Sequence, residues 1–132
     1  MHVSSRKLAS SVCQALAEDM PRGFMLTLTG STVHLSYQGD ELGASTAAKI
    51  VDEEDGRPIE QRLLTACTAV LSAVQDWVSE QTGEEWPTRN VATGAMPGAD
   101  IDPELMNVRL WFGPSWSHAA LALKPIPLSL LY

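Results

Sequence analysis

The strongest constraint on the fold is the stretch GFMLTLTGSTVHLSYQ, residues 23–38, in which apolar and polar side chains alternate on both sides of a Gly-Ser pair. A two-residue turn at Gly30 and Ser31 sets Phe24 opposite Tyr37, and every apolar residue except Met25 then opposes an apolar partner. The alternation and the turn register agree independently. The stretch therefore predicts a β-hairpin with one apolar face and one polar face.

Amphipathic helices are predicted on either side of this hairpin. Apolar residues recur every four positions between a possible N-cap at Ser4 or Ser5 and Pro21, which ends the pattern. The second helix is longer, with Pro58 in its first turn and Gly83 as its C-terminal cap. Its apolar face is broad enough to pack on a sheet.

Two connections have no sustained periodicity. Residues 39–58 contain one short element around 47–51 and the acidic run 52–55, which lacks the alternating ligand order of a calcium loop, so no metal site is expected. Residues 84–104 carry three prolines and two glycines. A connection of this length in a small domain predicts a long mobile loop.

A second hairpin is predicted from 106–112 and 119–123, with a four-residue turn at 114–117 and Phe112 opposite Ala119. Trp111 then points to the opposite face from Phe112. The remaining stretch, PIPLSLLY, favours an extended edge, and its apolar end must be covered by its own core or by a partner.

The element order α-β-β-α-β-β predicts a single α+β domain over residues 1–132. The simplest architecture is a two-layer sandwich, in which one four-stranded antiparallel sheet carries both helices on one face. In that arrangement the other face of the sheet holds the polar residues.

A candidate partner-binding site follows from combining the polar faces of the two hairpins. That face contains basic and aromatic side chains and no carboxylate, although the formal net charge of the chain is -7. It favours an acidic or aromatic group, with Trp111 as anchor and Arg109 as its charged neighbour. The alternative is an ordinary solvated sheet face. The candidate residues are Trp111, Arg109, His34, Lys124, Asn107 and Trp116.

Composition excludes several classes of protein. An acidic chain with a pI near 4.8 is a poor nucleic-acid or anionic-membrane binder. No apolar run approaches about 18 residues and no signal peptide is apparent, so a cytoplasmic protein is expected. The residue usage hints at a GC-rich genome and a bacterial or phage source. Cys13 and Cys67 lie on apolar helix sides and are expected to be buried thiols, with a disulfide left open if the helices touch there.

No catalytic or cofactor motif is present. The adjacent Ser117 and His118 are interpreted as diverging side chains rather than a nucleophile and its base. The sequence therefore favours a non-enzymatic protein-interaction module without a cofactor: an adaptor, a chaperone-like partner or an assembly component, with a homodimer as one option. The alternative is a small-molecule-binding protein or an enzyme, with Trp77 and Trp86 lining a site under 84–104.

In size, acidity and element order the chain is similar to small secretion chaperones and small phage assembly proteins. This is a similarity of architecture, and it carries over no functional residue.

Overall fold

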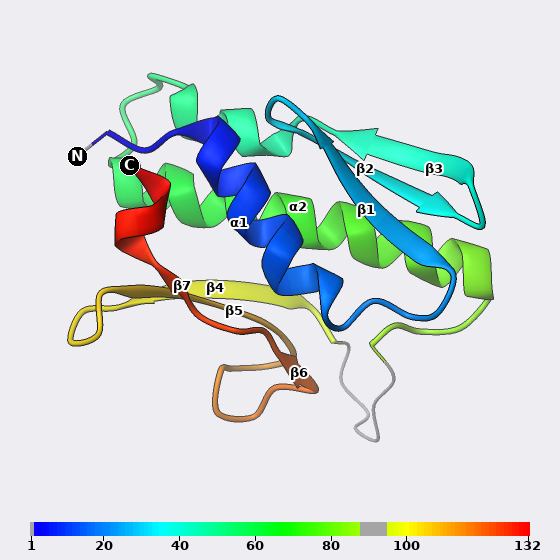
Figure 1. Cartoon of the computed structure of the whole chain (residues 1–132). Helices are drawn as coiled ribbons and strands as arrows, with labels where there is room; N and C mark the ends of the chain where they lie inside the picture. Colours follow the sequence, from blue (N-terminus) through cyan, green and yellow to red (C-terminus); the bar gives the residue numbers. More distant parts are fainter. Residues whose placement is uncertain (1, 88–94) are drawn as a thin grey trace.

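The computed structural model describes residues 2–87 and 95–132, and it shows an α+β fold in which the long second helix runs between two antiparallel sheets (Figure 1). The helices are α1 (Ser5–Ala17) and α2 (Ile59–Thr82), with short 3-10 helices η1 (Ala47–Asp52) and η2 (Leu128–Leu131). The first sheet contains β1 (Phe24–Thr29), β2 (Thr32–Tyr37) and β3 (Asp40–Ser45). The second contains β4 (Pro97–Asp102), β5 (Asn107–Phe112), β6 (Leu121–Ala122) and β7 (Ile126–Pro127).

The prediction that both hairpins join one sheet is wrong. The first hairpin continues through a tight turn into β3, and β5 pairs with β4 on one side and with β6 and β7 on the other. A four-stranded antiparallel sheet does exist, but it consists only of strands that follow α2. Strand β3 pairs with β2 and β4 pairs with β5, and no strand pairing of the described residues joins the two hairpins.

The first hairpin has the predicted register in full, from Thr29 opposite Thr32 to Phe24 opposite Tyr37. The rings of Phe24 and Tyr37 lie 4.7 Å apart between centroids. Leu35, on the predicted apolar face, is completely buried. Alternation and turn geometry were therefore sufficient to fix this register.

Both helices form where predicted. Ser4 caps α1 and accepts a hydrogen bond at 3.2 Å from the backbone N–H of Lys7. Helix α2 ends at Gly83, whose φ of 73° is the left-handed conformation that glycine adopts without steric cost. At its other end, the Arg62 guanidinium donates to the carbonyl oxygens of Val51 and Glu53 at 2.8 and 2.7 Å, which fixes η1 to α2.

The core lies between the helices and the inner faces of both sheets. Cys13 and Cys67 are buried free thiols, as expected. Burial raises the pKa of Cys13 to about 11 and that of Cys67 to about 12, because a thiolate would lose its hydration there. The largest fully buried side chains are Phe112, Leu8, Leu16, Leu35, Leu63, Leu71, Leu110, Leu123 and Leu131.

The C-terminal hairpin differs from its predicted register by two residues. Phe112 opposes Leu121 instead of Ala119, because the turn after β5 is longer than four residues and closes with the Ala120 N–H donating to the Phe112 carbonyl at 2.8 Å. A shift of two keeps the side chains paired between β5 and β6 on their predicted faces, whereas the register changes by one further residue between β6 and β7. Trp111 and Phe112 therefore still point in opposite directions.

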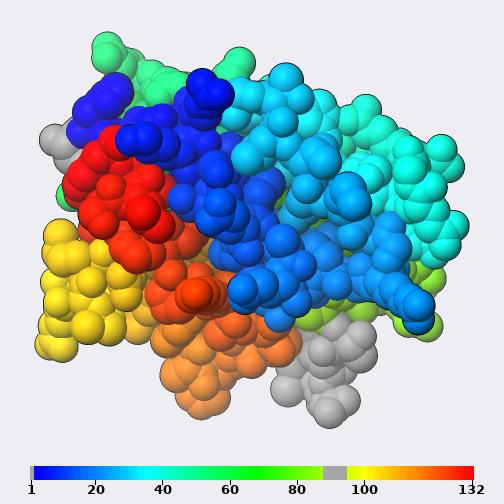
Figure 2. Space-filling view, viewed as in Figure 1, coloured from blue at the N-terminus to red at the C-terminus, as the bar shows by residue number. Residues whose placement is uncertain are grey.

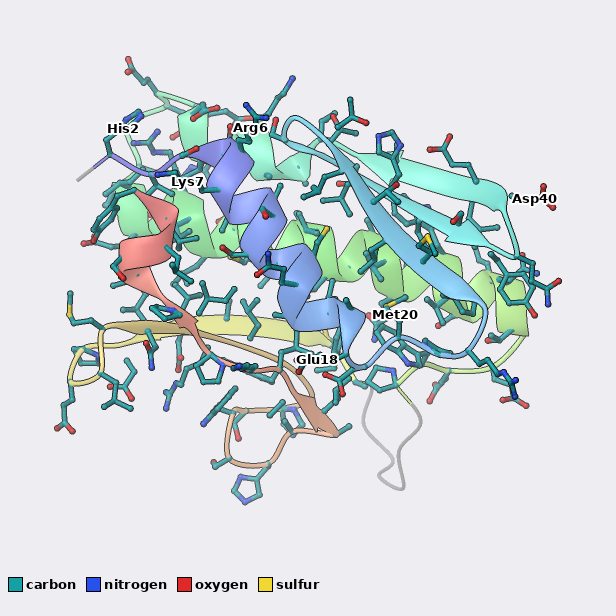
Figure 3. All side chains as sticks on the ribbon, viewed as in Figure 1. His2, Arg6, Lys7, Glu18, Met20 and Asp40 are labelled. Atoms are coloured by element: carbon teal, nitrogen blue, oxygen red, sulfur yellow. The ribbon has the colours of Figure 1, made fainter. Side chains whose placement is uncertain are left out.

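The apolar C-terminal segment packs on its own chain. Leu128 and Leu131 are buried, and the Ser4 N–H donates to the Leu131 carbonyl at 2.8 Å. The Lys7 ammonium group contacts the Tyr132 carbonyl. Figure 2 shows the first and last segments side by side, and Figure 3 shows Lys7 beside η2.

The expected loop 84–104 contains strand β4 at Pro97–Asp102, so this part of the expectation is wrong. Residues 88–94 of that loop lie outside the described residues, and the expected mobility stays a prediction. The single-domain assignment also stays a prediction. Among the described residues, no helix has the length and hydropathy needed to cross a membrane.

Candidate functional site

Arg109 lies on the face of the second sheet that is turned away from the core, which we call the outer face. Its neighbours in sequence, Val108 and Leu110, are fully buried on the inner face, so alternation along β5 places Arg109 outside. Asp100 is its cross-strand partner on β4. Arg109 Nε donates to Asp100 Oδ1 at 2.7 Å and Nη2 donates to Oδ2 at 2.6 Å. The guanidinium is therefore held in a bidentate ion pair.

The expectation that this face carries no carboxylate is wrong. Asp100 and Asp102 both come from β4, a strand that was not foreseen. The hydrogen bonds that Arg109 donates to Asp100 raise the pKa of Arg109 further above its ordinary value, with smaller contributions from the charges of Asp100 and Asp102. The positive charge of Arg109 is consequently offset locally.

Trp111 is largely covered, whereas the sequence predicted that it would be exposed. Its exposed fraction is only 9%, because its indole lies over Gly98 on β4, directly across the ladder. A Cβ atom on Gly98 would sit 2.3 Å from the indole, which means that only glycine leaves room for the ring. On the other side of β5, Trp111 opposes the small residue Ala122.

Trp116 lies in the turn after β5 and contacts both Trp111 and Arg109. Its ring meets that of Trp111 edge-on, with centroids 6.3 Å apart and an interplanar angle of 72°. The Arg109 Cζ atom lies 5.4 Å from the Trp116 ring centroid, within cation–π range. Asp100, Arg109, Trp111 and Trp116 thus form one connected group, which we call the Trp–Arg cluster.

The structure separates the other predicted site residues from this cluster to different degrees. Asn107 lies on the same strand, at the end of β5 between Asp102 and Pro127. Lys124 is exposed and faces α1. His34 belongs to the first sheet, where its Nδ1 lies 2.5 Å from Glu41 Oε1. The prediction that His34 and Arg109 share one sheet face is therefore wrong, because that face required both hairpins to lie in one sheet.

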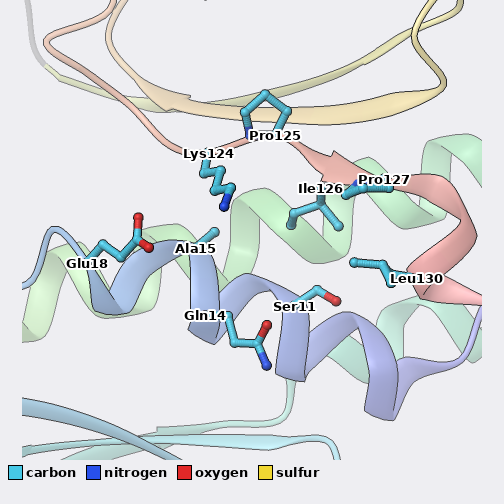
Figure 4. Close-up of a pocket in the computed structure, with 9 residues that line it drawn as sticks. All are labelled: Ser11, Gln14, Ala15, Glu18, Lys124, Pro125, Ile126, Pro127 and Leu130. Carbon is cyan, nitrogen blue, oxygen red and sulfur yellow. The ribbon is translucent and has the colours of Figure 1, made fainter.

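Lys124 lines a groove of about 190 Å³ between α1 and the segment that leads into η2 (Figure 4). The α1 side of the groove contributes Ser11, Gln14 and Glu18, and the other side includes Ile126. The groove therefore combines one cation and one anion with an apolar floor. Its volume is below the roughly 300–1,000 Å³ that is typical of small-molecule sites.

A second cavity, of about 250 Å³, lies beside Trp86 and Gln75. Gln75 Nε2 donates to the carbonyls of Trp86 and Ala95 at 3.2 and 2.6 Å, so one side chain ties together both ends of the described chain around 88–94. The Trp86 ring lies 5.2 Å from that of Phe112, which anchors it against the core. The residues that line the cavity are Gln75, Asp76, Ser79, Glu85, Trp86, Ala95 and Met96. Trp77 is absent from this lining because it packs over Gly43 of β3.

The interpretation that Ser117 and His118 diverge is wrong. The turn brings His118 Nδ1 to 3.2 Å from Ser117 Oγ and 3.3 Å from Ser115 Oγ. The His118 backbone N–H also donates to Ser115 Oγ at 3.2 Å, so these contacts close an exposed turn. A nucleophile–base pair needs a third group that orients the base through its other ring nitrogen, and both side-chain contacts of His118 among the described residues use Nδ1. Within residues 2–87 and 95–132, no three His, Cys, Asp or Glu side chains are placed to hold a metal ion.

Comparisons with protein-family models, curated proteins and solved structures find no match to this chain. The geometry of the site is therefore the basis for the functional argument. Sequence reasoning brought together Arg109, Trp111 and Trp116 but missed Asp100 and Gly98. A signal for them existed, because residues 98–102 alternate Gly-Ala-Asp-Ile-Asp with the period of a strand.

Proposed function

We propose that this chain is a small non-enzymatic protein-interaction module, acting as an adaptor, a chaperone-like partner or an assembly component. Its contact surface is the outer face of the second sheet around the Trp–Arg cluster. A cytoplasmic location and a bacterial or phage source belong to the same proposal and rest on composition alone.

The observation that carries this proposal is the fixed position of Arg109 beneath Trp116. Tryptophan and arginine are the residue types most often found at the energetic centres of protein interfaces. Two hydrogen bonds to Asp100 and the contact with Trp116 hold the arginine in one conformation. A side chain that is already ordered loses little conformational entropy when a partner binds.

The ion pair also changes the expected chemistry of the partner. Because Asp100 offsets the charge of Arg109, an acidic group gains less here than a solvent-facing arginine would offer. The half-buried ring of Trp116 instead favours an aromatic or apolar side chain on the partner. Leu130 and Tyr132, the exposed large apolar residues of the C-terminal segment, are proposed as a secondary contact.

The test is recovery of partner proteins by affinity purification from the native cells, with wild-type protein compared with Trp116→Ala. We expect Trp116→Ala to lose most of the specifically recovered partner, since interface tryptophans contribute about 2 kcal/mol or more. Ser117→Ala, in the same turn, is the matched control and should recover as much partner as the wild type. Reversing the charge at position 109, as in Arg109→Glu, is less suitable because it would also break the ion pair with Asp100. Equal recovery by Trp116→Ala and Ser117→Ala would contradict the proposal.

The alternative function, binding of a small molecule or substrate near 84–104, rests on the cavity at Gln75 and Trp86, whose volume of about 250 Å³ is also below the range typical of such sites. A ligand bound there should raise the melting temperature of the wild type but not of Gln75→Leu. Such a ligand would transfer the functional assignment from the Trp–Arg cluster to this cavity.

A further inference from the structure

The edges of the two sheets differ in how they are protected against pairing with another chain. Natural proteins block exposed sheet edges with charges, prolines, bulges or very short strands. Edge strand β3 carries two carboxylates and pairs with β2 through an irregular register, and edge strand β4 begins with a proline and also carries two carboxylates. On the remaining edge, β6 and β7 have two residues each, and β7 follows one proline and contains another. The residues concerned are Asp40, Glu41, Pro97, Asp100, Asp102, Pro125 and Pro127.

Strand β1 has none of these features. Its sequence, FMLTLT, contains no charge, proline or glycine over six residues. It pairs with β2 on one side, and on the other side no strand of the described chain pairs with it. In an antiparallel ladder the backbone groups point alternately to either side, so part of the N–H and C=O groups of β1 face this open edge.

Apolar side chains of β1 are also exposed on both faces of the sheet. Leu28 lies on the apolar face, where its cross-strand partner Val33 is fully buried, yet 38% of Leu28 is exposed. Met25, on the polar face of the first sheet, is 63% exposed. Figure 2 shows the first hairpin at the surface beside α1. Helix α1 contacts β1 but leaves the apolar side chain of Leu28 partly uncovered.

We propose that β1 pairs in antiparallel orientation with β1 of a second copy of this chain, which joins the two first sheets across a two-fold axis. Charge selects this occupant. In a chain with a net charge of -7, β1 is the one described sheet edge of six residues that can meet itself without opposing carboxylates or prolines. The contact is isologous and closed, so it produces a dimer and not a fibre.

The two-fold axis limits which residues can oppose each other. Residues paired across a sheet must lie on the same face, and among the registers that satisfy this we propose the one centred on Leu26, in which Phe24 opposes Leu28 and Met25 opposes Thr27. This register sets apolar residues of the inner face against one another and covers the exposed part of Leu28. It uses the first sheet and is independent of the proposed function of the Trp–Arg cluster in the second sheet.

The test is molar mass in solution, measured by sedimentation equilibrium on the full chain and on two charge variants. The wild type should show a mass of about twice the monomer value of 14.3 kDa. Thr27→Lys and Thr27→Glu each place like charges diagonally across the two-fold axis, and each should weaken the dimer by up to about fivefold. An equimolar mixture of the two variants should recover the dimer, because opposite charges then meet. A partner other than a second copy would not produce this recovery.

Ala44→Lys is the matched control, since Ala44 is exposed in the same cross-strand row but lies on the opposite edge. It should remain dimeric. Far-ultraviolet circular dichroism of each variant checks that it is folded. A wild type that stays monomeric throughout the concentration range overturns the proposal without reference to any variant. Dimers of folded Thr27→Lys as tight as those of the wild type would also overturn it.

Discussion

At the scale of single residues, three of the four tryptophans are explained by the fold. Trp111 covers Gly98, Trp77 covers Gly43, and Trp86 packs on Phe112. Both glycines lie in edge strands, where a large aromatic neighbour shields a backbone that has no side chain of its own. Trp116 lies in the turn after β5, where its ring contacts Trp111 and Arg109 and stays half-buried, which makes it the strongest candidate for an external partner.

The pairing of Gly98 with Trp111 predicts a coupled effect on stability. Gly98→Ala should lower the free energy of unfolding by about 1–3 kcal/mol, because its Cβ atom would lie 2.3 Å from the indole. In a Trp111→Leu background the same substitution should cost nothing or stabilise slightly, since alanine also restricts the unfolded chain. Urea unfolding of the two single variants and the double variant measures this coupling. An identical cost in both backgrounds would show that the indole does not occupy this space.

The buried thiol of Cys67 predicts a dependence of stability on pH. Its pKa is raised from an ordinary 9.0 to about 12, so above pH 9 the unfolded chain releases a proton that the folded chain retains. The stability due to the neutral thiol is fully present below pH 9 and is lost as the pH rises toward 12, at about 1 kcal/mol per pH unit.

We expect Cys67→Ala to remove this part of the pH dependence. The free energy of unfolding, measured between pH 8 and 11, should fall less steeply for the variant than for the wild type. The comparison of slopes cancels lysine and tyrosine titrations common to both proteins. Parallel curves for the two proteins would contradict the assignment to Cys67.

At the scale of secondary-structure elements, the C-terminal segment acts as part of the core. Helix η2 lies beside α1, and its residues alternate between burial and exposure: Leu131 is fully buried, whereas 55% of Leu130 is exposed. The hydrogen bond from Ser4 to Leu131 joins this segment to the start of α1. The two ends of the described chain therefore stabilise each other.

This arrangement predicts different outcomes for two adjacent substitutions. Leu131→Ala should lower the free energy of unfolding by about 2–5 kcal/mol, as expected for a leucine removed from a packed core. Leu130→Ala should change it by less than about 0.5 kcal/mol, as expected for a surface position. Thermal or urea unfolding of both variants measures the difference. Similar small losses for both would mean that η2 is not packed in solution.

Elements with strong local signals were predictable, and elements without them were not. A two-residue turn fixed the first hairpin, and the caps at Ser4 and Gly83 marked the ends of the helices. Strand β3 was missed because Asp40, Glu41 and Gly43 are residues with low strand propensity. The second hairpin was predicted with the correct faces and a register shifted by two, because the length of its turn is set by contacts within 113–120.

At the scale of the whole molecule, the arrangement of two sheets around α2 was beyond sequence reasoning. Which hairpin pairs with which depends on contacts between residues far apart in the chain, and two hairpins with apolar faces fit one sheet as well as two. The Trp–Arg cluster was likewise predictable only in the part that is local in sequence. Arg109, Trp111 and Trp116 lie close in sequence and came together as predicted, but Asp100 arrives on a strand that only the fold brings alongside β5.

The central claim is that the chain acts through the outer face of its second sheet, and site-specific photo-crosslinking tests it most directly. Benzoylphenylalanine is placed at exposed Ser117, beside Trp116 in the same turn, and, as a control, at exposed Lys49 of η1, and both proteins are irradiated in the native cells. We predict a discrete protein adduct from position 117 that is absent from position 49. No adduct at 117, or the same adducts at both positions, would contradict the claim.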